Sequence, residues 1–212
     1  MSWMLILGAL LVAGLIAASK TKQGEAAIEL AVIGSKDIVT QLAAGLAEVI
    51  VAPGKEPGKI KYPDGTVKNG GPASWRANNP GNITYSDEAV RYGAFPGVKL
   101  PWGKISFAVF PNEAAGFAAL LKLLKNKWYG PLTIAKAMER YLGWVDGKPP
   151  AGSVDNPAAY AEGIATAIGK PLSTVVNALS LEELTRMAKK IQAIEGWTAA
   201  GPDGKPGTIS RA

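Results

Sequence analysis

The stretch SLEELTRMAKKIQAIEGW, residues 180–197, predicts the last helix of a globular domain. Ser180 is followed three residues later by Glu183, a spacing typical of a capping box at a helix start. Gly196 is typical of a helix end. The stretch therefore has a defined beginning, a defined end and an apolar stripe between them.

Glu195 occupies a position of this helix where the pattern asks for an apolar residue. The core-facing series runs Leu184, Ala188, Ile191 and then Glu195. An apolar setting beside Ile191 and Ile194, together with the negative end of the helix dipole, would favour the protonated acid near neutral pH. A glycosidase needs such an acid to protonate a leaving oxygen. The alternative is an ordinary glutamate at a frayed and exposed helix end.

Further helices are predicted upstream, and with the last helix they form one domain over residues 74–197. They are expected after Asn112, over residues 133–141, and after Asp155. Residues 82–110 are expected to be extended. The predicted fold class is therefore mainly α (α+β), a helical domain with a small β element.

The first nineteen residues predict a membrane anchor. Residues 1–19 carry no charged side chain, and as a helix they would span roughly 28 Å, close to the hydrocarbon thickness of a bilayer. No positively charged segment precedes the apolar run, whereas a cleaved secretory signal needs one. Lys20 and Lys22 follow at once. A retained transmembrane helix is expected. Most of the chain would then lie on the side of the membrane where the flanking lysines are found.

The segments that flank the domain differ from it in composition. Residues 20–52 are expected to form an amphipathic helix that lies on the membrane or on partner chains. Residues 53–73, dense in Gly, Pro and Lys, predict a linker, with a short hairpin around Pro63-Asp64-Gly65 as an open alternative. Residues 198–212 are expected to be an irregular tail.

The composition narrows the chemistry of the chain. Its 212 residues include no His and no Cys, so the commonest metal ligand, the commonest neutral-pH base and thiol nucleophiles are all missing. Neither a metal nor a cofactor is expected, and catalysis would depend on carboxylates. Asp87 and Glu88, in an expected loop, are the best candidates for a second catalytic carboxylate. The net charge of +6 forms no basic stripe, so nucleic acid is not expected as a partner.

Residues 75–83, WRANNPGNI, are the second unusual stretch. Asn-Pro-Gly-Asn is strong turn chemistry, and the residues alone favour a tight loop before a strand. The alternative is a sugar site. The amides of Asn78, Asn79 and Asn82 suit sugar hydroxyl and N-acetyl groups, and Tyr85 offers an aromatic face to a pyranose ring.

The domain resembles a family of phage and prophage proteins that are often described as virion structural proteins. The likeness lies in WRANNPGNI at 75–83, FPNEAAGFAAL at 110–120, Tyr160 in a capped helix, and Ala193-Ile194-Glu195-Gly196. More loosely, it is similar to lysozyme-like peptidoglycan-cleaving domains of the glucosaminidase and lytic transglycosylase type, which place their acid at a helix end, before an Asn-rich segment. This similarity implies a circularly permuted lysozyme-like domain, in which Glu195 faces the loop 78–82 across a cleft.

The resemblance implies a membrane-anchored bacteriophage virion protein whose domain cleaves peptidoglycan at the host envelope during entry. The enzyme would be a lytic transglycosylase, or a muramidase or glucosaminidase, with Glu195 as acid and base. The sugar would be positioned by Asn78, Asn79, Asn82, Tyr85 and Tyr160. Expected partners are the lipid membrane, peptidoglycan and other virion proteins, including copies of this chain. The alternative is a non-enzymatic virion membrane protein whose domain binds glycan or capsid partners.

Overall fold

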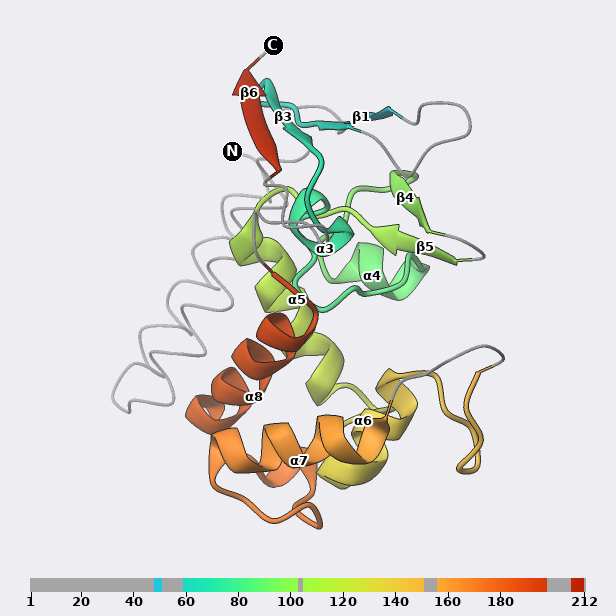
Figure 1. Cartoon of the computed structure of the whole chain (residues 1–212), viewed down its shortest axis with the longest axis vertical. Coiled ribbons are helices and arrows are strands. Elements are labelled where there is room, and N and C mark those ends of the chain that lie inside the picture. The colour runs from blue at the N-terminus through green and yellow to red at the C-terminus, as the bar shows by residue number, and fades with distance from the viewer. Residues whose placement is uncertain (1–47, 51–58, 103–104, 151–155, 198–206, 212) are drawn as a thin grey trace, which may run out of the picture.

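Helices and two small antiparallel sheets make up a mixed α+β fold (Figure 1). The computed structural model describes residues 48–50, 59–102, 105–150, 156–197 and 207–211. The expected anchor over residues 1–19 lies outside these ranges, as does most of the segment 20–52. In the part that is described, no helix is long and apolar enough to cross a membrane.

The long helices begin where the sequence places capping side chains. They are α5 (Glu113–Lys125) after Asn112, α6 (Ile134–Tyr141) after Thr133, α7 (Pro157–Ile168) after Asn156, and α8 (Leu181–Ile194) after Ser180. Each of these caps accepts a hydrogen bond from a backbone N–H of the first turn. The helix predictions are confirmed, with one correction: Asn156, not Asp155, caps α7, because Pro157 takes the first helical position.

The apolar faces of these helices form the larger of two cores. α7 packs against both α6 and α8, and α8 also contacts α5. The large side chains buried between them are Leu120, Leu124, Ile134, Met138, Ile164, Leu184, Met187 and Ile191. A short 3-10 helix, Val176–Ala178, contacts α5. The packing holds the end of α8, and therefore Glu195, in a fixed position relative to the rest of the domain.

The β structure is more extensive than the sequence predicts. β1 (Glu48–Ile50), β2 (Lys59–Lys61), β3 (Thr66–Asn69) and β6 (Thr208–Arg211) form an antiparallel sheet in that order. β2 and β3 are the hairpin around Pro63-Asp64-Gly65, and Gly65 has the positive φ (81°) that its turn requires. Ile60 of β2 is buried between two exposed lysines and anchors the sheet to the second core.

The short hairpin left open within the linker 53–73 is therefore confirmed, and two other sequence expectations are corrected. The helix expected to end at residue 52 is a strand over residues 48–50, and the tail is a strand over residues 208–211. Each of these strands is only three or four residues long, so hardly any alternation of apolar and polar residues can show in the sequence.

The segment 82–110, expected to be extended, contains a helix as well as strands. α4 (Asp87–Arg91) lies in it, followed by the hairpin of β4 (Lys99–Trp102) and β5 (Ile105–Ala108). Ser86 caps α4 by accepting from the N–H of Ala89, and the Glu88 carboxylate accepts from Arg91 and from the Tyr92 hydroxyl. Asp87 and Glu88 therefore belong to a helical first turn, where acids are favoured, and not to an active-site loop.

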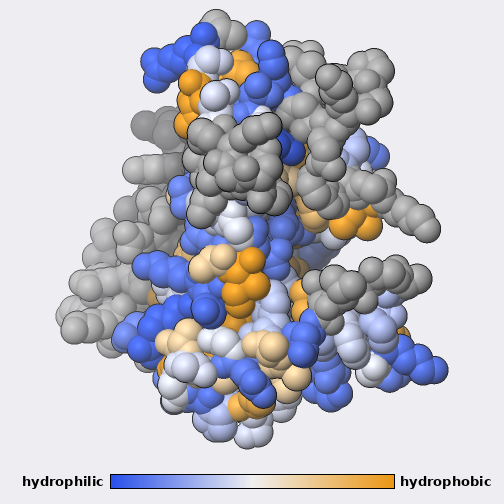
Figure 2. Space-filling model, viewed as in Figure 1, coloured by the Kyte–Doolittle hydropathy of each residue, from blue (hydrophilic) through white to orange (hydrophobic). Residues whose placement is uncertain are grey.

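Another short helix, α3 (Ala73–Arg76), precedes the Asn-rich stretch and lies close to the N-terminus of α5 in Figure 1. The space-filling view is indented between the end of the molecule that carries β4 and β5 and the end that carries α6 and α7 (Figure 2). The candidate site lies between the same elements.

Replacing Glu183 by Gln is expected to remove a pH-dependent contribution to stability at the start of α8. The N–H of Ser180 and the ammonium of Lys170 hold the Glu183 carboxylate and lower its pKa to about 2. Because this folded-state pKa lies below the ordinary value of 4.5, the contribution is present above that pH and is lost as the pH falls towards 2. Urea unfolding should show the wild type more stable than Glu183→Gln at neutral pH but not near pH 2. A difference that is the same at both pH values would contradict this.

Candidate functional site

Glu195 is the C-cap residue of α8, and both its backbone and its side chain are held by other elements. Its carbonyl oxygen accepts from the Ser74 hydroxyl at 3.3 Å. Its carboxylate accepts from Asn82 Nδ2 at 2.7 Å through Oε2, and from the Tyr160 hydroxyl at 2.8 Å through Oε1. Glu195 therefore lies at the loop 78–82 as expected, but in direct contact with it and not across a cleft, and Tyr160 of α7 also contacts the carboxylate.

The surroundings of the Glu195 carboxylate are polar, which corrects the apolar setting expected from the helical pattern. α8 ends at Ile194, and Gly196 follows Glu195 with φ of 69°. The core stripe therefore stops at Ile191, while Ile194 is 40 % exposed and Glu195 is half-buried. The carboxylate turns away from the core and meets two hydrogen-bond donors instead.

The loop 78–82 is held in place largely by its own amides. Asn79 is fully buried, and its side chain donates to the carbonyls of Ile83 and Ala108 and accepts from the N–H of Ile83. Asn78 is buried as well and donates to the carbonyl of Phe110. Both side chains thus serve the loop itself, and neither lines the pocket described below, which corrects the expectation that they contact a sugar.

Two features of this loop demand particular residues. Asn78 and Asn82 have φ of 51° and 47°, a left-handed conformation that asparagine tolerates better than most residues. Gly116 of α5 lies so close that a Cβ there would sit 1.8 Å from the Asn78 carbonyl oxygen. At Gly81, a Cβ would meet Leu120 at 2.7 Å and the Tyr141 hydroxyl at 2.8 Å. The loop therefore lies directly on α5 and α6.

Lys68 of β3 holds the loop from the side of the sheet. Its ammonium donates to the Trp75 carbonyl at 2.9 Å and to Asn78 Oδ1 at 2.6 Å. It also lies 4.7 Å from the centroid of the Trp75 ring and 5.8 Å from that of Trp197. Burial lowers the pKa of Lys68 to about 8, an effect that the carboxylate of Glu113 opposes. Lys68 thus connects the sheet both to the loop and to the residues that follow Glu195.

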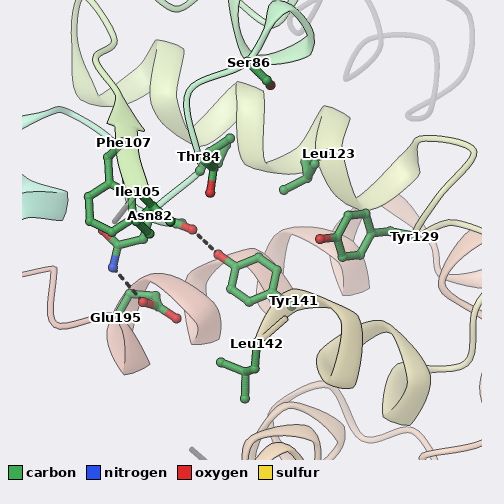
Figure 3. Close-up of a pocket in the computed structure, with 12 residues that line it drawn as sticks. Asn82, Thr84, Ser86, Ile105, Phe107, Leu123, Tyr129, Tyr141, Leu142 and Glu195 are labelled. Atoms are coloured by element: carbon green, nitrogen blue, oxygen red, sulfur yellow. Dashed lines mark hydrogen bonds between the residues drawn. The ribbon is translucent and has the colours of Figure 1, made fainter. Parts of the chain in front are cut away.

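A pocket of about 410 Å³ opens beside Glu195 (Figure 3). In this view Glu195, Asn82, Ile105 and Phe107 lie on one side, Leu123 and Tyr129 on the other, and Tyr141 between them. The remaining lining residues are Gly81, Ile83, Thr84, Ser86 and Leu142. Glu195 is the one carboxylate among these lining residues. Elsewhere in the described part of the chain, no group of three or more acidic residues is placed to hold a metal ion.

No family model and no curated protein matches the chain. The arrangement around Glu195 is thus the main guide to function.

The pocket also contains aromatic residues that the sequence does not single out. The ring centroids of Tyr129 and Tyr141 are 6.3 Å apart, and those of Tyr141 and Tyr160 are 6.1 Å apart. The Tyr141 hydroxyl donates to the Gly81 carbonyl. Burial, helped by the nearby Tyr160 and Glu195, raises the pKa of Tyr141 well above its usual value, so this phenol stays a donor. Nothing in the sequence distinguishes Tyr129 and Tyr141 from the other four tyrosines of the chain.

Tyr85, which was expected to position a sugar, lies outside the pocket lining. Its hydroxyl accepts from the N–H of Gly97 at 2.7 Å, and its own N–H donates to the Ser106 carbonyl. Of the sugar-positioning residues named from the sequence, Asn82 and Tyr160 are therefore the two that the fold brings to Glu195.

Proposed function

We propose that residues 74–197 form a peptidoglycan-cleaving domain in which Glu195 is the general acid and base. The observation that carries the proposal is a single carboxylate, held by Asn82 and Tyr160, at the wall of a pocket whose described lining is mostly apolar or aromatic with a few polar side chains. A positioned carboxylate supplies proton transfer, and aromatic walls with a few polar groups suit the faces and hydroxyls of sugar rings. A helix-end glutamate beside an Asn-rich loop also supports a circularly permuted lysozyme-like domain.

The presence of one carboxylate in the lining favours the lytic transglycosylase route. Most retaining and inverting glycosidases use two carboxyl groups that flank the scissile bond. Glu195 is the one carboxylate among the described lining residues, so in this proposal the substrate provides the second group. Glu195 gives its proton to the glycosidic oxygen as the bond from that oxygen to C1 breaks. The C6 hydroxyl of the same sugar then bonds to C1 and returns its proton to Glu195, leaving a 1,6-anhydro sugar.

The test of this proposal is the release of fragments from isolated peptidoglycan by the full-length chain. Mass analysis of the fragments distinguishes an anhydro end from the reducing end that a muramidase or glucosaminidase leaves. Soluble fragments with anhydro ends are the expected result. Peptidoglycan that stays intact would contradict the proposal.

A second candidate is a domain that binds glycan or capsid partners without cleaving anything. It is favoured by one observation: both oxygens of the Glu195 carboxylate already accept a hydrogen bond, as they would in a binding site. Co-sedimentation of the chain with peptidoglycan, with no soluble product, is the result that this alternative predicts.

We further infer that the domain belongs to a bacteriophage virion protein that is anchored in a lipid membrane and acts at the host envelope. The support is the uncharged run 1–19 with Lys20 and Lys22 after it, together with the resemblance of residues 74–197 to phage virion proteins. Other virion proteins, and further copies of this chain, are the proposed partners.

Tyr160→Phe is expected to lower kcat/KM on peptidoglycan about tenfold or more, because it removes one donor to Glu195 but keeps the ring. The melting temperature should change little. Tyr85→Phe is the matched control, since it removes a phenol that lies outside the pocket lining and accepts from the N–H of Gly97. Equal activity of the two variants would contradict a role for Tyr160 at the reacting carboxylate.

A further inference from the structure

An exposed aromatic ring lies close to two cations on the surface that follows α5. Trp128 is 55 % exposed and is the one aromatic residue among the exposed large hydrophobic residues of the described chain. Lys127 Nζ lies 4.9 Å from the centroid of its ring, and the guanidinium carbon of Arg140 lies 5.9 Å from it. Both cations are exposed, and within the described residues neither forms an ion pair. Trp128, Lys127 and Arg140 are called the basic aromatic patch below.

This patch adjoins the pocket through Tyr129. Tyr129 follows Trp128 directly in the sequence and lines the pocket, where Figure 3 places it across from Glu195. The positive charge of Arg140 acts on the Tyr129 hydroxyl, where it opposes the rise in pKa that burial causes. Arg140 thus acts on both the pocket residue Tyr129 and the exposed Trp128, so the patch continues the pocket outward.

The backbone under the patch is held in place by Asn126. Its Oδ1 accepts from the N–H of Trp128 at 2.8 Å and from the N–H of Tyr129 at 3.0 Å. Its Nδ2 donates to the Tyr92 hydroxyl at 3.2 Å. Because this turn is already ordered, a ligand that binds there does not have to pay the entropy of ordering it.

We propose that the basic aromatic patch is an outer subsite for the acidic part of the glycan strand. This inference rests on the proposed function. A pocket of about 410 Å³ holds only a short piece of a polymer, so the strand must continue over the neighbouring surface. In peptidoglycan that continuation carries carboxylates, on the peptide stems and on those lactyl groups that bear no stem. The Trp128 ring offers a face for a sugar, and Lys127 and Arg140 offer the charges that complement those carboxylates.

A surface of anionic lipid is the other partner that a Trp, a Lys and an Arg together would suit. Proximity to the pocket favours the glycan, because Trp128 is the chain neighbour of Tyr129, which lines the pocket across from Glu195. A patch that rested on a membrane would need no such proximity.

Binding is measured with full-length Glu195→Gln, which is expected to bind glycan strands without cleaving them. The probes are soluble glycan strands with peptide stems and, for comparison, neutral N-acetylglucosamine oligomers of similar length. In this background Trp128→Ala is expected to weaken binding of the acidic strands about tenfold, and Arg140→Gln about threefold. Arg140→Gln should leave the binding of the neutral oligomers unchanged. The loss of affinity for the acidic strands that this variant causes should become smaller as salt is added.

Lys189→Gln is the matched control for charge, because it removes an exposed cation from α8 that lies outside the pocket lining. It should bind both probes as the parent does. If Trp128→Ala perturbs folding, Arg140→Gln still tests the patch. Unchanged binding of the acidic strands in both patch variants overturns the proposal. So does a loss of binding to anionic phosphatidylglycerol vesicles while strand binding stays intact.

The same experiment separates this inference from the proposed function. A chain that loses strand binding in the patch variants, but whose wild type releases no fragments from peptidoglycan, supports the outer subsite and overturns cleavage. A wild type that cleaves, with patch variants that bind strands as well as the parent does, overturns the outer subsite alone.

Discussion

Glu195→Gln is expected to lower the rate of fragment release from peptidoglycan by a factor of about 10² to 10⁴, the usual contribution of a general acid or base. Glutamine has the shape of glutamate and keeps an oxygen that can accept from Asn82 or Tyr160. It cannot give a proton to the glycosidic oxygen or take one back from the C6 hydroxyl. The measurement is a time course of soluble fragments from isolated peptidoglycan, with full-length protein.

The matched control for this variant is Glu162→Gln. Glu162 is exposed on α7, the helix that also carries Tyr160, and does not line the pocket. Its replacement should leave the rate unchanged. Full activity of Glu195→Gln would remove Glu195 from the mechanism, even if the wild type cleaves. If the rate of fragment release falls in both variants while their melting temperatures stay unchanged, the assignment of Glu195 as the general acid and base is equally contradicted.

Gly116→Ala is expected to destabilise the domain by about 3 kcal/mol, the upper part of the usual cost of overpacking. A Cβ at this position would lie 1.8 Å from the carbonyl oxygen of Asn78 and 2.9 Å from Pro80. Those atoms belong to a buried loop and cannot rotate away as the end of a flexible side chain would. Because the loop carries Asn82, activity should fall together with stability. Urea unfolding gives the free energy directly.

Gly163→Ala is the counterpart, because Gly163 is also a glycine inside a helix. A Cβ there would meet only the Cε of Lys190, at 3.4 Å, at the flexible end of that side chain. This replacement is expected to stabilise the domain by about 1 kcal/mol, since alanine is the better helix former. If Gly116→Ala were as stable as Gly163→Ala, the loop 78–82 would not lie against α5.

The elements that the sequence predicts well are those whose signals are local. Helix caps bond to backbone groups only a few residues away, so for them the sequence pattern and the structure agree. Examples are Ser180 with Glu183, Asn112 before α5, and Gly169 after α7. The four-stranded sheet has no such local signal, because β3 and β6 pair although the sequence of most of the domain lies between them. Nothing near Thr208–Arg211 in the sequence announces a partner that lies so far upstream.

The candidate site divides in the same way. The helical pattern and the resemblance single out Glu195, and the turn residues single out the Asn loop. What the pattern cannot separate is an asparagine that binds a ligand from one that holds a turn, since both tasks use the same amide. Burial decides this: Asn79 is fully enclosed, whereas Asn82 reaches the carboxylate. Tyr129 and Tyr141 join the pocket only through tertiary packing.

The pairing of β6 with β3 also determines how the domain would carry mechanical load. The chain enters this sheet at Glu48 of β1 and leaves it at Arg211 of β6, and the strand registers place these two residues at the same end of the strands. Tension applied between those two points acts across the strands and opens their hydrogen bonds one after another from that end. Because Lys68 of β3 holds the loop 78–82, such a load would reach the loop that carries Asn82.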